Sequence, residues 1–191
     1  MYSKLRVIGL AGPAGVGKTT LAEALVDKLG YERMSFATAL KEFADAMVST
    51  EDIGGISFTA PLSVIDKTTA RPWLVAIGAG ARQAFGKDFW VDQFHNRLMN
   101  KLEGHWHETV KVVIDDVRYP NEVSYIEDEL GGVVILLDRA DIEPANPEEE
   151  KSLAEVEDMV DHLFTMTNDV TLEQVKEEFR LFCPVLELEE F

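Results

Sequence analysis

The chain has 191 residues, of which 46% are hydrophobic and 28% charged, so it is long enough for one well-packed domain and is not expected to be disordered. Its formal net charge of −17 at pH 7 argues against non-specific nucleic-acid binding, because phosphate backbones would be repelled. Cys183 is the single cysteine, which excludes an intrachain disulfide, and no apolar run has signal-peptide or membrane-spanning length. We therefore expect a cytoplasmic setting and no membrane partner.

A glycine-rich motif stands near the start of the chain, where residues 12–19 read GPAGVGKT and match G-x-x-x-x-G-K-[ST] at every fixed position. A strand is predicted before it over 6–10 and a helix after it over 20–29. This context is typical of a phosphate loop, whose backbone N–H groups surround a polyphosphate at a helix N-terminus. Lys18 is expected to reach the β and γ phosphates, and Thr19 to hold Mg²⁺. A glycine-rich turn without a ligand is the alternative, and the full match weighs against it.

Two further elements and a loop are predicted next. Residues 31–36 have strand character, and an apolar stripe at helical spacing predicts a helix over 39–48. Lys41 lies on the polar face of that helix, either as a solvated charge or near the acceptor substrate. Residues 49–70 lack a period and are expected to form a loop, and another helix follows over 71–85.

The predicted helix that opens at Arg71 carries unusual glycines. Pro72 suits its first turn. Gly78 and Gly80 each cost about 1 kcal/mol relative to alanine inside a helix, so we expect something to approach closely there. Arg82 lies on the same face as Gly78, where its guanidinium could grip an anion. Surface salt bridges are an equally good interpretation of both arginines from spacing alone.

The next helix is predicted to follow Asp88, a suitable N-cap, and to run to about residue 102. Its aromatic residues, Trp90 among them, are more typical of a core than of ligand stacking. His105 and His107 resemble a metal-binding pair, but no cluster of further ligands accompanies them in the sequence. Metal binding is therefore not expected at these histidines.

An apolar run over 110–116 ends in Asp115 and Asp116, the form of a Walker B segment. In a parallel sheet this places a carboxylate beside the phosphate loop, where it can order the water shell of Mg²⁺. Arg118 returns a cation to the same edge. The remaining chain predicts helices over 121–130, 151–159 and 171–182, strands over 133–137 and 162–166, and a solvated loop over 140–150.

Several segments together resemble the deoxynucleoside monophosphate kinases of bacteriophages, a branch of the P-loop nucleotide kinases. They are GPAGVGKT at 12–19, SFATALKEFA at 35–44, RPWLVAIGAGAR at 71–82, FGKDFWV at 85–91, VVIDDVRYPNEV at 112–123, GGVVILLDR at 131–139 and TNDVTLEQV at 167–175. The resemblance implies an α/β fold, a three-layer αβα sandwich with a five-stranded parallel sheet. It also implies transfer of the ATP γ-phosphoryl group to a deoxynucleoside 5′-monophosphate, with ATP and Mg²⁺ as cofactors.

The resemblance implies roles at the matching positions. Catalysis is expected from Lys18, Arg82, Arg118 and Asp116. Residues expected to bind ATP are Gly12, Ala14, Gly15, Val16, Gly17, Lys18, Thr19, Thr20 and, in a lid, Arg139. Residues expected to bind the acceptor are Phe36, Lys41, Arg71, Gly78, Arg82, Trp90 and Arg118. Thr19 and Asp116 are expected to serve the metal, with Asp115 as a close rival.

We expect a single domain over 1–191, with an acceptor-binding insertion near 39–85 and a short lid near 139–152. The chain departs from the family pattern in two places. Gly78-Ala79 stands where members often have Gly-Thr, so a hydroxyl contact is missing. The lid segment is rich in acid and poor in arginine, which weakens the case for a lid-borne arginine grip.

Two other functions stay open on sequence alone. One is another small-molecule P-loop kinase, acting for instance on a phosphorylated isoprenoid precursor as a phosphomevalonate-like enzyme; the D-V-R context weighs against it. The other is a non-enzymatic ATP-binding switch, although the chain contains no N-K-x-D guanine-reading motif. The expected partners are small-molecule nucleotides, with a homodimer left open, and the host cytoplasm is the expected location if the chain is phage-encoded.

Overall fold

The computed structural model describes residues 5–48, 67–103, 108–166 and 172–182. The chain divides into two compact units. One, which we call the sheet unit, comprises Met1–Met34 and Leu102–Phe191, and the other, the helical unit, comprises Ser35–Lys101. His105, His107 and Cys183 lie outside the described residues, as does most of the expected loop over 49–70.

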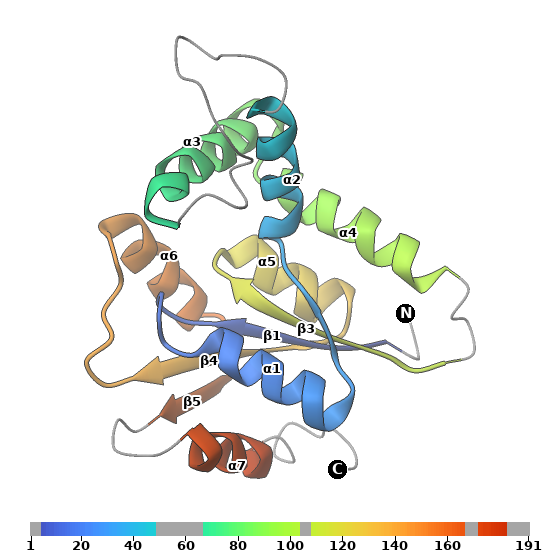
Figure 1. The fold of residues 1–191 in the computed structure, drawn as a ribbon, viewed down its shortest axis with the longest axis vertical. Coiled ribbons are helices and arrows are strands. Elements are labelled where there is room, and N and C mark those ends of the chain that lie inside the picture. The colour runs from blue at the N-terminus through green and yellow to red at the C-terminus, as the bar shows by residue number, and fades with distance from the viewer. Residues whose placement is uncertain (1–4, 49–66, 104–107, 167–171, 183–191) are drawn as a thin grey trace. The chain divides into compact units, whose positions relative to one another are not determined.

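A five-stranded sheet forms the centre of the sheet unit (Figure 1). Its strands are β1 (Leu5–Ala11), β2 (Glu32–Met34), β3 (Val110–Val117), β4 (Val133–Arg139) and β5 (His162–Met166). They lie in the order β2-β3-β1-β4-β5, and every neighbouring pair is parallel. The predicted five-stranded parallel sheet is confirmed. Because β1 is central, the loop that follows it lies between the carboxyl ends of its neighbours, where ligands bind in such sheets.

Helices cover both faces of this sheet, which gives the predicted three layers. The helices of the unit are α1 (Lys18–Leu29), α5 (Pro120–Ser124), the π-helix η1 (Tyr125–Glu129), α6 (Pro147–Glu157) and α7 (Leu172–Phe182). On one face, Leu21 and Leu25 of α1 and Phe179 of α7 share a core with Ile8 and Val113. On the other face, Ile126 of η1 lies so close to β1 that a Cβ at Gly9 would be 2.8 Å from its Cδ1.

The helical unit consists of α2 (Ala37–Val48), α3 (Lys67–Phe85) and α4 (Phe89–Leu102). Aromatic contacts join the segments, since the rings of Phe36 and Phe94 lie 4.5 Å apart and those of Phe43 and Trp90 lie 6.3 Å apart. The Trp90 indole also donates a hydrogen bond to the carbonyl of Gly78, at 3.1 Å. The packing therefore ties α2 to α4 by an apolar contact and α3 to α4 by a hydrogen bond.

Three predicted boundaries were wrong. Helix α3 begins at Lys67 rather than Arg71, so Pro72 lies inside the helix and the predicted loop over 49–70 extends too far. Pro72 is the sixth residue of α3 and has no N–H to donate to the preceding turn, yet the helix continues to Phe85. Helix α6 begins at Pro147 rather than 151, because Asn146 accepts a hydrogen bond from the Glu149 N–H and caps it. Strand β2 is three residues long, half the predicted length.

Candidate active site

The phosphate loop connects β1 to α1 and requires its glycines. Gly12, Gly15 and Gly17 all have positive φ, at 133°, 85° and 117°, a region that side chains with a Cβ rarely adopt. At Gly12 the space is also closed, because a Cβ would lie 2.5 Å from the carbonyl oxygen of Leu137 on β4. The glycine pattern read from the sequence is therefore a property of the backbone path here, and not of composition alone.

Lys18, the first residue of α1, folds back over the loop. Its Nζ donates hydrogen bonds to the carbonyls of Gly12 at 2.6 Å and Pro13 at 2.9 Å. Burial lowers the pKa of this ammonium group from 10.5 to about 8, and the positive charge of Arg118 acts in the same direction. The carboxylates of Glu149, Asp116 and Asp115 oppose that change. Lys18 thus lies within a cluster of charges from β3, the turn after it and α6.

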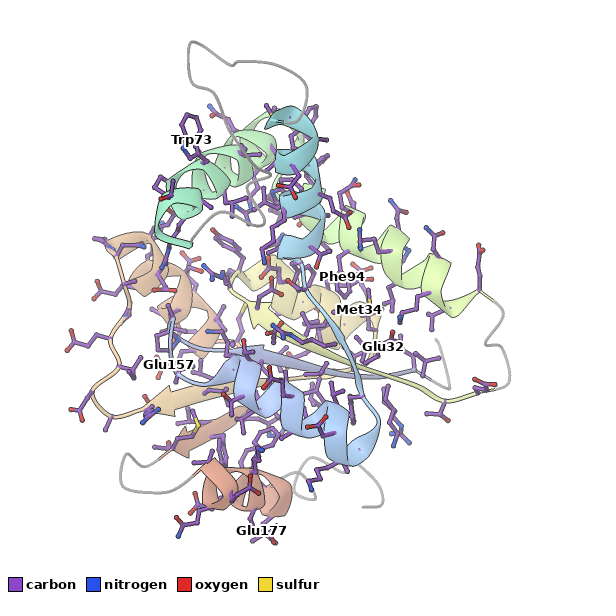
Figure 2. All side chains as sticks on the ribbon, viewed as in Figure 1. Glu32, Met34, Trp73, Phe94, Glu157 and Glu177 are labelled. Atoms are coloured by element: carbon purple, nitrogen blue, oxygen red, sulfur yellow. The ribbon has the colours of Figure 1, made fainter. Side chains whose placement is uncertain are left out.

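The Walker B strand supplies a carboxylate that touches the phosphate-loop helix. The Thr19 hydroxyl donates a hydrogen bond to Asp115 Oδ2 at 3.1 Å, and Asp115 is buried with 6% of its surface exposed. The same Oδ2 also pairs with Arg33 Nη2 at 2.6 Å. Figure 2 labels Glu32 and Met34, which flank Arg33 on β2. The hydrogen bond reaches Asp115, the residue that the sequence ranked behind Asp116 as the metal partner.

Hydrogen bonds on both sides hold the backbone at Arg118. The buried Glu122 accepts from the N–H groups of Arg118 at 2.7 Å and Tyr119 at 3.1 Å. On the other side, the Ser152 hydroxyl donates to the Arg118 carbonyl. The backbone from which the guanidinium extends is therefore fixed between α5 and α6.

The segment predicted as a lid contains a turn and the start of α6. Arg139 ends β4, and its carbonyl accepts from the Ile142 N–H at 3.2 Å. Further along, the Tyr119 hydroxyl lies 3.4 Å from Glu148 Oε1, so α6 contacts the turn after β3 at its first turn as well as at Ser152. The acidic lid segment is thus tied to Arg118 in this structure.

The helical unit holds the other predicted site residues. Arg82 and Gly78 share a face of α3, since a Cβ at Gly78 would lie 3.7 Å from Arg82 Nη1 and 3.4 Å from Leu40 Cδ2. A Cβ at Gly80 would meet no atom of the described residues within 4 Å, so protein packing there does not explain that glycine. Lys41 and Arg71 are exposed, whereas Phe36 and Trp90 are buried. Their roles toward an acceptor stay predictions.

Within the sheet unit, the structure therefore brings Lys18, Thr19, Asp115, Asp116 and Arg118 into one charged cluster. Sequence reasoning missed Arg33, Glu122 and Ser152, which hold members of this cluster in place. Glu122 carried a signal, because it lies in the DVRYPNE segment; Arg33 and Ser152 carried none.

The oxygen atoms at this cluster suit a magnesium ion. Mg²⁺ binds protein through one or two oxygen ligands and completes its shell with phosphates and water. Thr19 Oγ1 and Asp115 Oδ2 are two such oxygens, side by side at the N-terminus of α1. Among the described residues, no three His, Cys, Asp or Glu side chains are grouped so that they could hold a metal without other ligands. Two adjacent oxygens of this kind fit a metal whose remaining ligands come from phosphate and water.

Comparison with known proteins agrees with this geometry. A family model described as "ATPase family associated with various cellular activities (AAA)" matches residues 8–183. A protein of Acanthamoeba polyphaga mimivirus, named "Putative deoxynucleotide monophosphate kinase", is 30% identical over 184 residues, which cover 88% of this chain and 91% of the viral protein. The dephospho-CoA kinase from Campylobacter jejuni matches with a TM-score of 0.55 and 13% identity, over 96% of this chain and 100% of that one. The last similarity shows the shared fold.

Within the described part of the chain, none of the helices combines the length and the apolar character that crossing a membrane requires.

Proposed function

The chain belongs to the P-loop nucleotide kinase family, and from this membership we propose that it transfers the γ-phosphoryl group of ATP to a deoxynucleoside 5′-monophosphate. The observation that carries the proposal is the charged cluster at the phosphate loop, in which Lys18, Arg118 and Asp115 converge. The name of the mimivirus relative supports the choice of acceptor. A monophosphate is already an ionised nucleophile, so the enzyme needs positioning and charge neutralisation rather than a general base.

On the donor side, the amides of the phosphate loop bind the ATP phosphates at the N-terminus of α1. The binding residues are Gly12, Ala14, Gly15, Val16, Gly17, Lys18, Thr19 and Thr20. Lys18 exchanges its bonds to the Gly12 and Pro13 carbonyls for bonds to the β and γ phosphates. Arg118, with its backbone held by Glu122 and Ser152, offsets the charge on the transferred group, and Arg139 contributes from the lid near 139–152.

Thr19 and Asp115 hold Mg²⁺ in this proposal, and Asp116 acts beside them through its charge. When bound there, the ion would help to neutralise the charge that develops during transfer. The hydrogen bond between Thr19 and Asp115 supports Asp115 over Asp116 as the metal-binding carboxylate, because it holds two oxygen atoms next to each other before the metal and nucleotide bind.

We assign the acceptor to the helical unit, as an insertion within one kinase domain. Arg82 provides a guanidinium on α3, on the face that also carries Gly78, and a guanidinium suits a phosphate. The remaining acceptor residues in this assignment are Phe36, Lys41, Arg71 and Trp90. Trp90 acts through its hydrogen bond to the Gly78 carbonyl, which fixes the part of α3 that carries Arg82.

A substrate screen tests the proposal. Purified protein with ATP and Mg²⁺ is offered each of the four deoxynucleoside monophosphates, several ribonucleotides and phosphomevalonate, and ADP release is measured. We expect release with at least one deoxynucleoside monophosphate. Release only with phosphomevalonate would establish a different kinase. Intact ATP binding without ADP release for any acceptor would contradict the proposal and favour an ATP-dependent switch.

A further inference from the structure

Arg33 is an unexpected neighbour of the metal-binding oxygens. Its Nη2 lies 2.6 Å from Asp115 Oδ2, and that oxygen is the one to which the Thr19 hydroxyl donates. Arg33 is 43% exposed at its side chain, whereas Asp115 is 5% exposed. A buried carboxylate is therefore paired with an arginine that water reaches.

The pairing follows from the sheet. In the parallel register of β2 with β3, Arg33 lies opposite Val113, and Asp115 is two residues further along the same face. Val113 belongs to the core beneath α1, so Arg33, Asp115 and Thr19 all belong to the α1 side of the sheet. Arg33 thus reaches the carboxylate diagonally from the neighbouring strand.

From this arrangement we infer that Arg33 competes with the metal ion for the Asp115 carboxylate, and so controls metal binding through Asp115 without contacting the substrate. A divalent cation at Asp115 and Thr19 would be repelled by the guanidinium on the same oxygen. Orientation of the carboxylate does not depend on Arg33 alone, because Thr19 also holds it. Metal binding displaces the exposed arginine, and the phosphates of ATP supply the negative charge that makes this exchange favourable. Free metal is thereby disfavoured relative to metal that arrives with the nucleotide.

This inference rests on the proposed function, and metal affinity tests it without measuring turnover. Mn²⁺ replaces Mg²⁺ as the probe, and its binding to the full-length protein is followed by electron paramagnetic resonance with and without ATP, in the absence of acceptor. Arg33→Met removes the charge and keeps an apolar stem. We expect it to tighten Mn²⁺ binding about fivefold, the scale of a partly exposed ion pair, with the larger change in the absence of ATP.

Two further variants separate this effect from a general change of charge or fold. Lys28→Met makes the same change of net charge on α1, where Lys28 is an exposed residue of the last turn, nine residues or about 14 Å beyond Thr19; it should leave Mn²⁺ affinity unchanged. Arg33→Lys keeps a cation beside Asp115, so its Mn²⁺ affinity should stay close to that of the wild-type protein.

Unchanged or weaker Mn²⁺ binding in Arg33→Met would overturn the inference, as would equal tightening in Lys28→Met. If Arg33→Met does not fold, Arg33→Lys still tests the inference, because weaker binding than wild type in that variant would contradict competition. Absence of Mn²⁺ binding by the wild-type protein with ATP would instead refute the metal site of the proposed function.

Discussion

The sheet unit and the helical unit hold their candidate site residues in different ways. In the sheet unit, Lys18 and Asp115 each have two bonded partners, and the Arg118 backbone is held on both sides. In the helical unit, Lys41 and Arg71 are exposed on helices, where long side chains keep their rotamer freedom. Polar groups fixed in advance favour stabilisation of developing charge, whereas side chains that become ordered on binding lower affinity.

This difference predicts different kinetic consequences in the two units. Substitutions at the phosphate loop should act mainly on the rate of transfer. Substitutions in α2 and α3 should act mainly on the KM for the acceptor. Substitutions of Lys18 and Arg82 test that division, and Glu122 and the pH dependence of ATP binding test how the sheet unit holds its charges, from the largest expected effect to the smallest.

Lys18→Met should lower kcat/KM by about a thousandfold, because a charge directed at the transferred phosphoryl group is lost. The melting temperature should not fall, since burial already disfavours the Lys18 charge, as its lowered pKa of about 8 indicates. ADP release and thermal unfolding measure the two effects. Activity within tenfold of wild type would contradict the role of Lys18.

Arg82→Met should raise the KM for the acceptor by about tenfold to a hundredfold, the scale of one or two charge-assisted hydrogen bonds, while ATP affinity stays unchanged. Initial rates at varied acceptor concentration, together with calorimetric ATP titration, distinguish these outcomes. Arg97→Met is the matched control, because Arg97 pairs with the exposed Glu42 in the same unit. A loss of ATP affinity in Arg82→Met would break the proposed division between the units.

Glu122→Ala should lower the free energy of unfolding by about 2 kcal/mol, because it leaves the N–H groups of Arg118 and Tyr119 without their buried acceptor. Rate should fall as well, since the backbone of Arg118 loses its support. Urea unfolding gives the stability, with Glu129→Ala, an exposed glutamate of η1, as the control. Equal effects of the two substitutions would show that the acceptor at 122 has no special role.

ATP affinity should fall as the pH rises through about 8, by at most tenfold per pH unit. The free protein has a lowered Lys18 pKa of about 8, and bound phosphates raise it, so binding above this pH takes up a proton. Calorimetry in buffers of different ionisation enthalpy measures that uptake, which Lys18→Met should abolish. The same lowered pKa affects the free energy of unfolding. Burial of the Lys18 charge destabilises the folded state fully below about pH 8, where this lysine is charged in both states, and the destabilisation diminishes toward pH 10.5. Affinity independent of pH between 7 and 9 would contradict this prediction.

The sequence by itself determined which strands and helices of the sheet unit follow one another along the chain, and where the phosphate loop lies. These features depend on local pattern: a run such as 133–137 is apolar throughout because both faces of its strand are covered, and the loop needs glycine wherever φ is positive. Local signals also misplaced some helix boundaries. Pro72, a residue that favours a helix start, predicted a start at Arg71, but it lies inside α3.

Only the tertiary structure decided how the charges at the site are paired. Asp115 and Asp116 are neighbours on β3, where the register of β3 with β1 is irregular, and nothing in an apolar strand covered on both sides indicates which of the two carboxylates lies toward α1. Thr19 of α1 bonds to Asp115 because Asp115 lies on the same side of the sheet as Val113, which packs under α1. Arg33 meets Asp115 because β2 lies next to β3, and Ser152 meets Arg118 across 34 positions of chain. Such partners are selected by strand order and helix packing, which bring together residues that share no pattern in the sequence.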